Sequence, residues 1–185
     1  MSFDENWPEV AVIREGVYPN LSFQRLVKLL NRPPILLQKI LPGMTQTDYE
    51  KKFFLRYVRE YDAWDQEVPI LLPQAWIQWH SKNKGDLRSQ GSSYATDPHR
   101  VDFVVFWNNH RFVILVDDIS HYAQITGDHW HADEERYSMR LREDRKLYRE
   151  GWQVFRVSNW EMRKGEETVL EMLDDLQAHI GFWHR

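Results

Sequence analysis

The 185-residue sequence predicts one α/β domain, with a central sheet covered by helices. Three observations lead to this prediction. Hydrophobic residues make up 42% of the chain and aromatic residues 14%, which supplies enough apolar surface for a packed core. The spacing of apolar residues changes along the chain from helical periodicity to the alternation and continuous apolar runs of buried strands. The chain also contains no internal repeat and no low-complexity tract.

The helices are predicted from their caps and their apolar spacing. Residues 1–45 are expected to form a helical N-terminal extension and residues 46–185 the α/β body, together one compact unit. Asn20-Leu21-Ser22 opens the first helix, and Thr45 and Thr47 are candidate N-caps of the third. Gly151 is well placed to end a long helix that begins near Asp133. Helices are expected at 22–30, 35–41, 47–61, 133–150 and 166–180.

The strands are predicted from apolar runs, at residues 68–79, 100–107, 112–117 and 152–157. Residues 80–99 are polar and contain Gly85, Gly91 and Pro98, which indicates a long loop. Loops of this length inside a compact domain are often functional. This one is either a solvated loop or a segment that contacts substrate through its basic side chains, which are Lys82, Lys84 and Arg88, with Arg100 at its far edge.

Two acids stand out because their neighbours are apolar. Asp102 lies in Arg-Val-Asp-Phe-Val-Val-Phe, and Asp117 ends Phe-Val-Ile-Leu-Val-Asp. A two-residue turn at Asn108-Asn109 between the two strands pairs Asp102 with Leu115, whereas a turn at Asn109-His110 or a four-residue loop pairs it with Asp117. In each case Asp102, Leu115 and Asp117 share one face of the sheet. Only a three-residue loop would place Asp102 on the opposite face of the sheet from Leu115 and Asp117.

Residues that share a face of two neighbouring strands lie within roughly 5–8 Å of each other. Two carboxylates this close repel each other unless a cation or a shared proton lies between them. A divalent ion that prefers oxygen ligands, Mg²⁺ or Mn²⁺, suits the pair. Such an ion can polarise a phosphate and activate a water molecule for attack. The alternative is structural: Asp117 caps a turn at the strand end, while Asp102 pairs with Arg100 or with a more distant base.

The order of these motifs resembles that of the very-short-patch-repair-like endonucleases and their uncharacterised relatives, in the restriction-endonuclease-like PD-(D/E)xK superfamily. The resemblance covers about 60 residues, through Arg-Val-Asp-Phe, Val-Asp-Asp-Ile-Ser-His and the segment RLREDRKLYREGWQVFR at 140–156. It implies a three-layer α/β fold with a mixed sheet, and metal-dependent hydrolysis of phosphodiester bonds in nucleic acid, with DNA as the expected substrate.

The resemblance also implies roles for individual residues. Asp102 matches the metal-binding acid of the first strand and Asp117 the second acid, while His121 matches a downstream His that would assist proton transfer. Asp144 matches the helix acid, and Arg140 one helical turn earlier is a candidate partner for it. Glu50 corresponds loosely to an acid that some members bring to the site.

The sequence departs from the family pattern at two positions. Leu115 stands where the relatives have an acid, usually Glu, and Asp118 stands where they have Gly. Because Leu cannot bind a metal, the site would recruit Asp118, His121 or Glu50, or it would be degenerate. The second outcome gives the alternative function: a non-catalytic nucleic-acid-binding or protein-interaction module in a defence, repair or transposition system.

A second polar cluster contains His129, His131 and Asp133, close to His121 in the sequence. The His-x-His spacing suits two zinc ligands, but the segment is polar, so a solvated or substrate-side loop is the default interpretation. Trp130, between the two histidines, is the tryptophan best suited to stacking on a nucleic-acid base.

Composition limits the remaining classes. The absence of cysteine excludes disulfides and thiolate zinc sites and suits a cytoplasmic protein. No apolar run is long enough to cross a membrane, so no membrane partner is expected. The formal charge of −4 still permits a local basic surface for nucleic acid, contributed in part by Arg100 and Arg140. A protein partner or a homodimer is compatible with the sequence.

Overall fold

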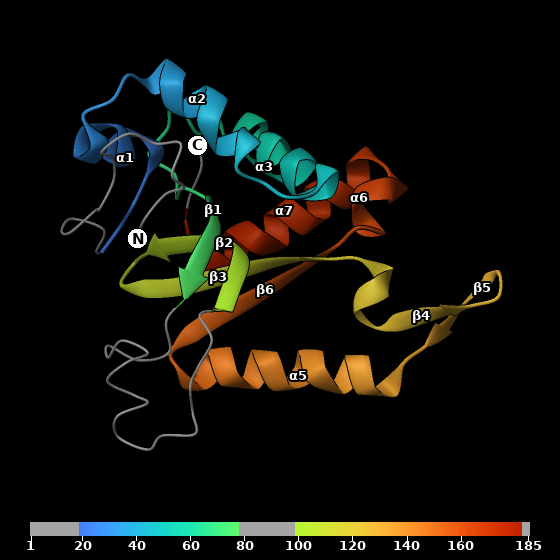
Figure 1. The fold of residues 1–185 in the computed structure, drawn as a ribbon. Helices are drawn as coiled ribbons and strands as arrows, with labels where there is room; N and C mark the ends of the chain where they lie inside the picture. Colours follow the sequence, from blue (N-terminus) through green and yellow to red (C-terminus); the bar gives the residue numbers. More distant parts are fainter. Residues whose placement is uncertain (1–18, 78–98, 183–185) are drawn as a thin grey trace.

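The computed structural model describes residues 19–77 and 99–182. Its centre is a four-stranded mixed sheet in the order β1-β2-β3-β6 (Figure 1). The β1–β2 and β2–β3 pairs are antiparallel, and the β3–β6 pair is parallel. The strands are β1 (Leu72–Ile77), β2 (His99–Trp107), β3 (His110–Asp117) and β6 (Trp152–Ser158).

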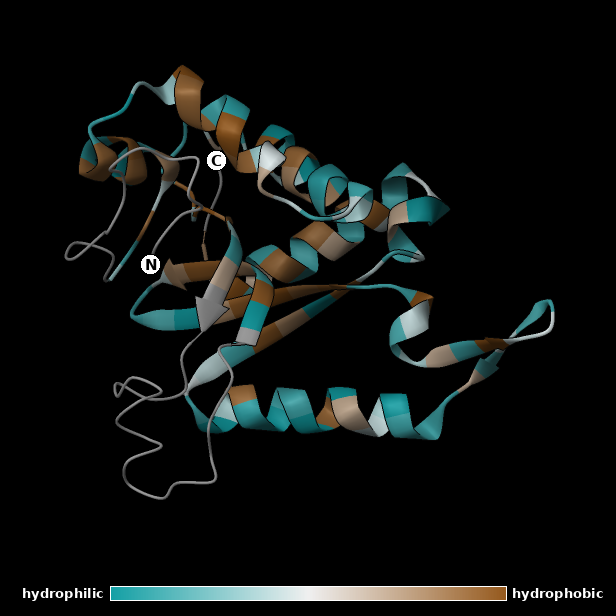
Figure 2. Ribbon diagram, in the orientation of Figure 1, coloured by the Kyte–Doolittle hydropathy of each residue, from teal (hydrophilic) through white to brown (hydrophobic). Residues whose placement is uncertain are grey.

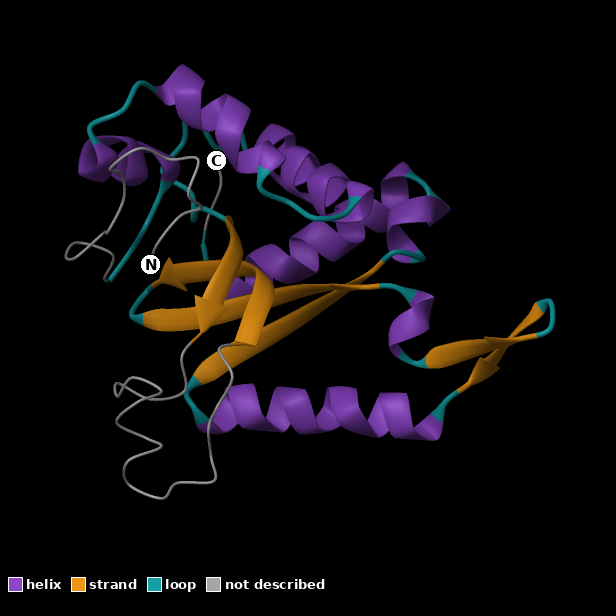
Figure 3. Ribbon diagram, in the orientation of Figure 1, coloured by secondary structure: helices purple, strands orange, loops and turns teal. Residues whose placement is uncertain are grey.

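Helices cover both faces of this sheet. Helix α5 (Glu134–Arg149) lies along one face, and the remaining long helices lie on the other (Figures 1 and 3). The latter are α1 (Phe23–Leu30), α2 (Pro34–Gly43), α3 (Asp48–Glu60) and α7 (Glu166–Ile180), with the short α6 (Glu161–Lys164) beside them. The α/β class with a mixed sheet is therefore confirmed, and the arrangement is compatible with three layers.

Local sequence signals explain where the helices begin and end. The side chains of Ser22, Thr47 and Asp133 accept hydrogen bonds from backbone N–H groups in the first turns of α1, α3 and α5. Gly151 follows α5 with φ +80°, a conformation that is strained for residues with a Cβ atom. These features confirm Ser22 and Thr47 as predicted helix starts and Gly151 as the predicted end of the long helix. Thr45, the other candidate cap of the third helix, instead donates to the Pro42 carbonyl.

The core lies between the sheet and the α3–α7 layer. Phe53 and Phe54 of α3 contact Phe103 of β2, with ring centroids 5.6 and 6.2 Å apart. The hydroxyl of Tyr61 donates to the carbonyl of Leu173 in α7, which links the two helices. Leu21, together with side chains of α1 and α2, is fully buried in the same core. The N-terminal helices thus belong to the packed body.

The opposite face of the sheet is covered very differently. Helix α5 is mostly hydrophilic (Figure 2), and Leu147 is its one buried residue. A helix with so little buried apolar surface depends on other contacts to hold it in place. Polar contacts between α5 and the sheet supply them, and they form part of the site described below.

The structure differs from the sequence prediction between β3 and α5. Residues expected to be a loop form a two-stranded hairpin, β4 (Ala123–Thr126) and β5 (His129–Ala132), preceded by the 3₁₀ helix η1 (Ile119–His121). The strand predicted at 68–79 is shorter, since β1 begins at Leu72. The predicted loop at 80–99, with Lys82, Lys84 and Arg88, lies almost wholly outside the described residues. In the described part of the chain, no helix has the length and apolar character needed to cross a membrane.

Candidate active site

The β2–β3 hairpin brings the two predicted acids to one face of the sheet. Trp107 pairs with His110 across a two-residue turn at Asn108-Asn109, whose φ angles are +50° and +62°. Asn tolerates this left-handed conformation, which the tight turns of hairpins require. The register extends to a position where Asp102 lies opposite Leu115. Asp102 and Asp117 therefore share a face, as the first of the proposed turns predicts.

The Asp102 carboxylate lies where the two strands separate. The β2–β3 pairing ends at Phe103 and Ile114, and one step further the Oδ2 of Asp102 accepts a hydrogen bond from the Val116 N–H at 2.7 Å. Burial first, and then the charges of Glu50 and Asp117, raise the pKa of the Asp102 carboxyl from 3.8 to about 6, against the opposing effect of the Val116 hydrogen bond. Asp102 is thus a half-buried acid close to two other carboxylates.

Asp117 is held by two cationic or potentially cationic side chains. Its Oδ1 lies 2.7 Å from Nδ1 of His121, and its Oδ2 accepts from Nη1 of Arg156 at 2.6 Å. Burial alone would raise the pKa of Asp117, but the hydrogen bonds from His121 and Arg156 outweigh it, and the pKa lies below its ordinary value. Asp117 is therefore ionised at neutral pH, and it orients the His121 ring.

Only one ring nitrogen of His121, Nδ1, is engaged by Asp117, so that Nε2 can exchange a proton with a substrate or with water. The His121 side chain is 34% exposed. Among the described residues, Nε2 has no hydrogen-bond partner. A half-exposed imidazole oriented by a carboxylate is a common arrangement for a group that donates or accepts a proton.

Arg156 connects the sheet to α5. Its Nε and Nη2 donate to Asp144 at 2.6 to 3.1 Å, and Nη2 also lies 3.2 Å from Glu143. Burial by itself lowers the pKa of Arg156, but its hydrogen bonds with Asp144 and Asp117 raise it. One guanidinium thus contacts three carboxylates, and this network holds α5 where apolar packing is sparse.

Asp144 reaches the site as predicted, but its partner is a different residue. The sequence suggested Arg140, one helical turn before it. In the structure Arg140 donates to Glu143 at 3.0 Å, while Arg156 binds Asp144. The strand-end arginine was visible in the sequence motif, but only the sheet register shows that it points toward α5.

Asp118 is occupied by structural contacts. Its Oδ1 accepts from the Ser120 N–H at 3.0 Å and its Oδ2 from Nδ2 of Asn159 at 3.1 Å. These contacts, led by the Ser120 N–H, lower the pKa of Asp118. One oxygen thus caps the turn after β3, and the other binds Asn159, which follows β6; the role of Asp118 as a metal ligand stays a prediction.

Glu50 is buried near the site, at 4% exposure. Its oxygens accept from Thr47 Oγ1, from the Gln46 N–H and from Nε2 of Gln74 at 3.1, 2.8 and 2.6 Å. The first two contacts join Glu50 to the start of α3, where its own N–H donates to Oγ1 of the N-cap Thr47, and the third joins the helix to β1. The charge of Glu50 nevertheless acts on Asp102, so the loosely predicted third acid does lie close to the pair.

Leu115 takes the place on this face where the resemblance leads us to expect an acid. It is 7% exposed and pairs in register with Arg156 on β6. On this face of the sheet, the buried Leu115 side chain on β3 therefore lies between Asp102 on β2 and Arg156 on β6. The departure seen in the sequence is therefore located within the site itself.

The carboxylates fit a hard divalent cation in chemical type. Oxygen donors of Asp102 and Asp117 suit Mg²⁺ or Mn²⁺. The pKa of Asp102 is raised first by burial and then by the charges of Glu50 and Asp117, and a bound cation would offset these charges. Within residues 19–77 and 99–182, however, no group of three or more His, Asp or Glu side chains is arranged to hold a metal ion. A metal would thus rest on two protein carboxylates, with solvent or substrate completing its coordination.

The remaining predicted residues have other contacts. Arg100 donates to Oε1 of Gln46 at 2.5 Å, near the start of α3. Asp133 caps α5 and pairs with Arg136, whose guanidinium also donates to the Ser120 and Ala123 carbonyls. His129 and His131, for which a zinc site was the alternative to a solvated loop, lie on the exposed β4–β5 hairpin.

Comparisons of the chain with models of protein families, with curated proteins and with solved structures find no match. The functional argument therefore rests on the geometry of the site formed by Asp102, Asp117, His121, Asp144 and Arg156.

Proposed function

We propose that this chain is a metal-dependent hydrolase of phosphodiester bonds in nucleic acid, with DNA as the expected substrate and a restriction-endonuclease-like fold. The observation that carries the proposal is the common sheet face of Asp102 and Asp117, with the charge of Glu50 acting on Asp102. Holding several acids in mutual repulsion costs stability, and perturbed carboxyl groups of this kind concentrate at functional sites.

Each residue of the site has a role in this proposal. Asp102 and Asp117 would hold Mg²⁺ or Mn²⁺, which would polarise the phosphate and lower the pKa of a water molecule. His121, oriented through Nδ1 by Asp117, transfers a proton through Nε2. Arg156 is a positioning residue that fixes Asp117 against β6 and ties Asp144 to the same network.

A non-catalytic nucleic-acid-binding module is the second candidate function. Two observations favour it: Leu115 occupies the acid position, and both oxygens of Asp117 are already paired with His121 and Arg156. In such a module the ion network would stabilise the fold and hydrolyse nothing.

Cleavage of end-labelled oligonucleotides separates the two functions. Single- and double-stranded substrates are incubated with the full chain in Mg²⁺, in Mn²⁺ and in EDTA. The proposal expects cleavage that requires the metal and is lost in Asp102→Asn. The control is Asp128→Asn, at an exposed turn position of the β4–β5 hairpin, which retains full activity. Metal-independent cleavage, or cleavage equal in Asp102→Asn, overturns the proposal, and absence of cleavage favours the binding module.

A further inference from the structure

One side of α5, next to the side that holds Asp144, exposes side chains that helices of globular proteins usually bury. Tyr137 is 57% exposed, Leu141 37% and Tyr148 76%. The spacing of these residues, four and then seven positions apart, aligns them along one side of the helix. They lie away from Leu147, the residue through which α5 packs on the sheet. The helix therefore carries an apolar and aromatic strip that the described residues leave partly or largely exposed.

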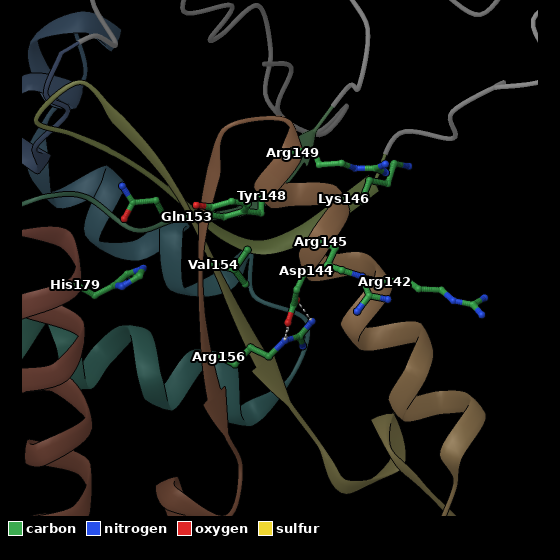
Figure 4. A pocket seen from close by; sticks show the side chains of 10 residues that line it. All are labelled: Arg142, Asp144, Arg145, Lys146, Tyr148, Arg149, Gln153, Val154, Arg156 and His179. Atoms are coloured by element: carbon green, nitrogen blue, oxygen red, sulfur yellow. Dashed lines mark hydrogen bonds and ion pairs between the residues drawn. The ribbon is translucent and has the colours of Figure 1, made fainter.

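A strip of cations runs beside the aromatic one. Arg142, Arg145, Lys146 and Arg149 follow the i, i+3, i+4, i+7 pattern of a single helix face and extend over about 10.5 Å of the axis. Within the described residues, the three arginines of this strip form no ion pair with a carboxylate. Asp144 is directed to Arg156 instead (Figure 4), and Glu143 pairs with Arg140 and Arg156. The positive charge of Arg142, Arg145 and Arg149 is thus left uncompensated by described carboxylates.

The two strips border a cavity of about 1240 Å³ between α5, β6 and α7. Besides the four cations, Tyr148, Gln153, Val154 and His179 line it, and Tyr148 points from α5 toward Gln153 on β6 (Figure 4). The cavity lies at the edge of the sheet, because β6 pairs with β3 alone among the described strands. Its lining combines an aromatic ring, apolar surface and a concentration of cations.

We propose that this face of α5 and the adjoining cavity bind an unpaired strand of nucleic acid. Its phosphates lie on the strip of Arg142, Arg145, Lys146 and Arg149, and a base stacks on Tyr148. Cations that follow a backbone whose charges repeat about every 3.4 Å, next to an aromatic ring, are the combination used by proteins that bind single strands. The inference rests on the proposed function for the choice of nucleic acid as the polyanion.

The same features disfavour other occupants. A second copy of the chain would bring two cationic strips together, and like charges repel. A duplex would hide its base faces in the stack and leave Tyr148 without a role. An acidic peptide would satisfy the cations but gives no reason for the exposed rings beside them.

The position of the cavity connects this surface to the candidate active site. Asp144 and Arg156 line the cavity, and Arg156 also binds Asp117. A strand lying on α5 would therefore pass next to the network that orients Asp117 and His121. Binding there would present a phosphodiester to the site from the side of β6.

Fluorescence anisotropy with a labelled oligothymidine tests this inference. The full chain is titrated in EDTA, so that binding is measured without metal and without cleavage. We expect Arg145→Ala/Arg149→Ala to weaken binding roughly tenfold or more and to reduce the slope of log K against log salt by about 1.4, since each lost phosphate contact lowers it by about 0.7. Lys39→Ala/Lys51→Ala, on α2 and α3 at the opposite face of the sheet, removes the same charge and is expected to leave the slope unchanged.

Two further variants test the stacking contact. Tyr148→Ala is expected to weaken binding by roughly fivefold to a hundredfold, whereas Tyr148→Phe keeps the ring and the affinity. Because Tyr148 is 76% exposed, both variants keep the fold, which circular dichroism checks.

Three results would overturn the inference. They are an unchanged affinity and salt slope in Arg145→Ala/Arg149→Ala, a duplex that binds more tightly than the single strand with no effect of Tyr148→Ala, and complete competition by polyglutamate at equal charge. Strand binding that depends on α5 without any metal-dependent cleavage would support this inference and refute catalysis, so the two proposals fail separately.

Discussion

Replacing Asp102 by Asn is expected to stabilise the protein at neutral and alkaline pH. The Asp102 carboxyl has a pKa of about 6 in the folded chain, against 3.8 as its ordinary value. Folding therefore favours the protonated form, and the stability of the wild type falls as the pH rises from about 4 to about 6. Above pH 6 the full cost is present, about 3 kcal/mol at 1.36 kcal/mol per pH unit.

The amide of Asn removes this charge and still offers an oxygen to the Val116 N–H. Because a neutral oxygen accepts a weaker hydrogen bond than a carboxylate, the figure of about 3 kcal/mol is an upper value. For a chain of this size it corresponds to a rise in melting temperature of roughly 6–12 °C at pH 8. Near pH 4 most of the difference between variant and wild type disappears, since Asp102 is then largely protonated in the folded state.

Urea unfolding of both proteins at pH 4 and pH 8, in EDTA, measures this effect. Asp128→Asn is the matched control, and its free energy of unfolding should change by less than about 0.5 kcal/mol, because the residue is exposed. An Asp102→Asn variant that is less stable than the wild type at pH 8, or that differs equally at both pH values, would refute the reasoning. Such a result would mean that the ionised Asp102 carboxylate does not lower the free energy of unfolding.

Three other variants test neighbouring parts of the site. Arg156→Leu leaves Asp117 and Asp144 without their cation and is expected to cost roughly 3–5 kcal/mol in urea unfolding at pH 7; a loss below about 1 kcal/mol contradicts the network's role in holding α5. Leu115→Glu is expected to melt lower than wild type without metal and to recover part of the loss in millimolar Mg²⁺ or Mn²⁺, whereas equal losses with and without metal would show that no ion binds beside position 115. His121→Ala is expected to slow cleavage by roughly 10²-fold with the fold intact, and an unchanged rate removes the imidazole from the mechanism.

Local signals in the sequence predicted most of the regular structure. Thr47 and Glu50 define the start of α3, and the Asn108-Asn109 pair defines the two-residue turn that sets the β2–β3 register. The β4–β5 hairpin was missed because it has no buried face, so hydrophobic alternation was weak. The remaining local signal was Gly127, with φ +63°, followed by Asp128 at the turn.

The candidate site was predictable only in part. The shared face of Asp102 and Asp117 follows from strand parity, which is a local property of a hairpin. The partner of Asp144 cannot be predicted from such a local property. Arg156 reaches Asp144 from β6, a parallel strand whose position depends on the crossover through α5. Sequence spacing favoured Arg140, the neighbour on the same helix, and tertiary structure gave that residue a different partner in Glu143.

The central claim is that Asp102 and Asp117 together hold a divalent cation. Calorimetric titration of the full chain with Mn²⁺ at pH 7.5 tests it most directly, because it requires neither a substrate nor turnover. The account predicts saturable binding in the wild type and in Asp128→Asn, and loss of binding in Asp102→Asn. A wild type that binds no Mn²⁺, or an Asp102→Asn variant that binds it unchanged, would contradict the claim.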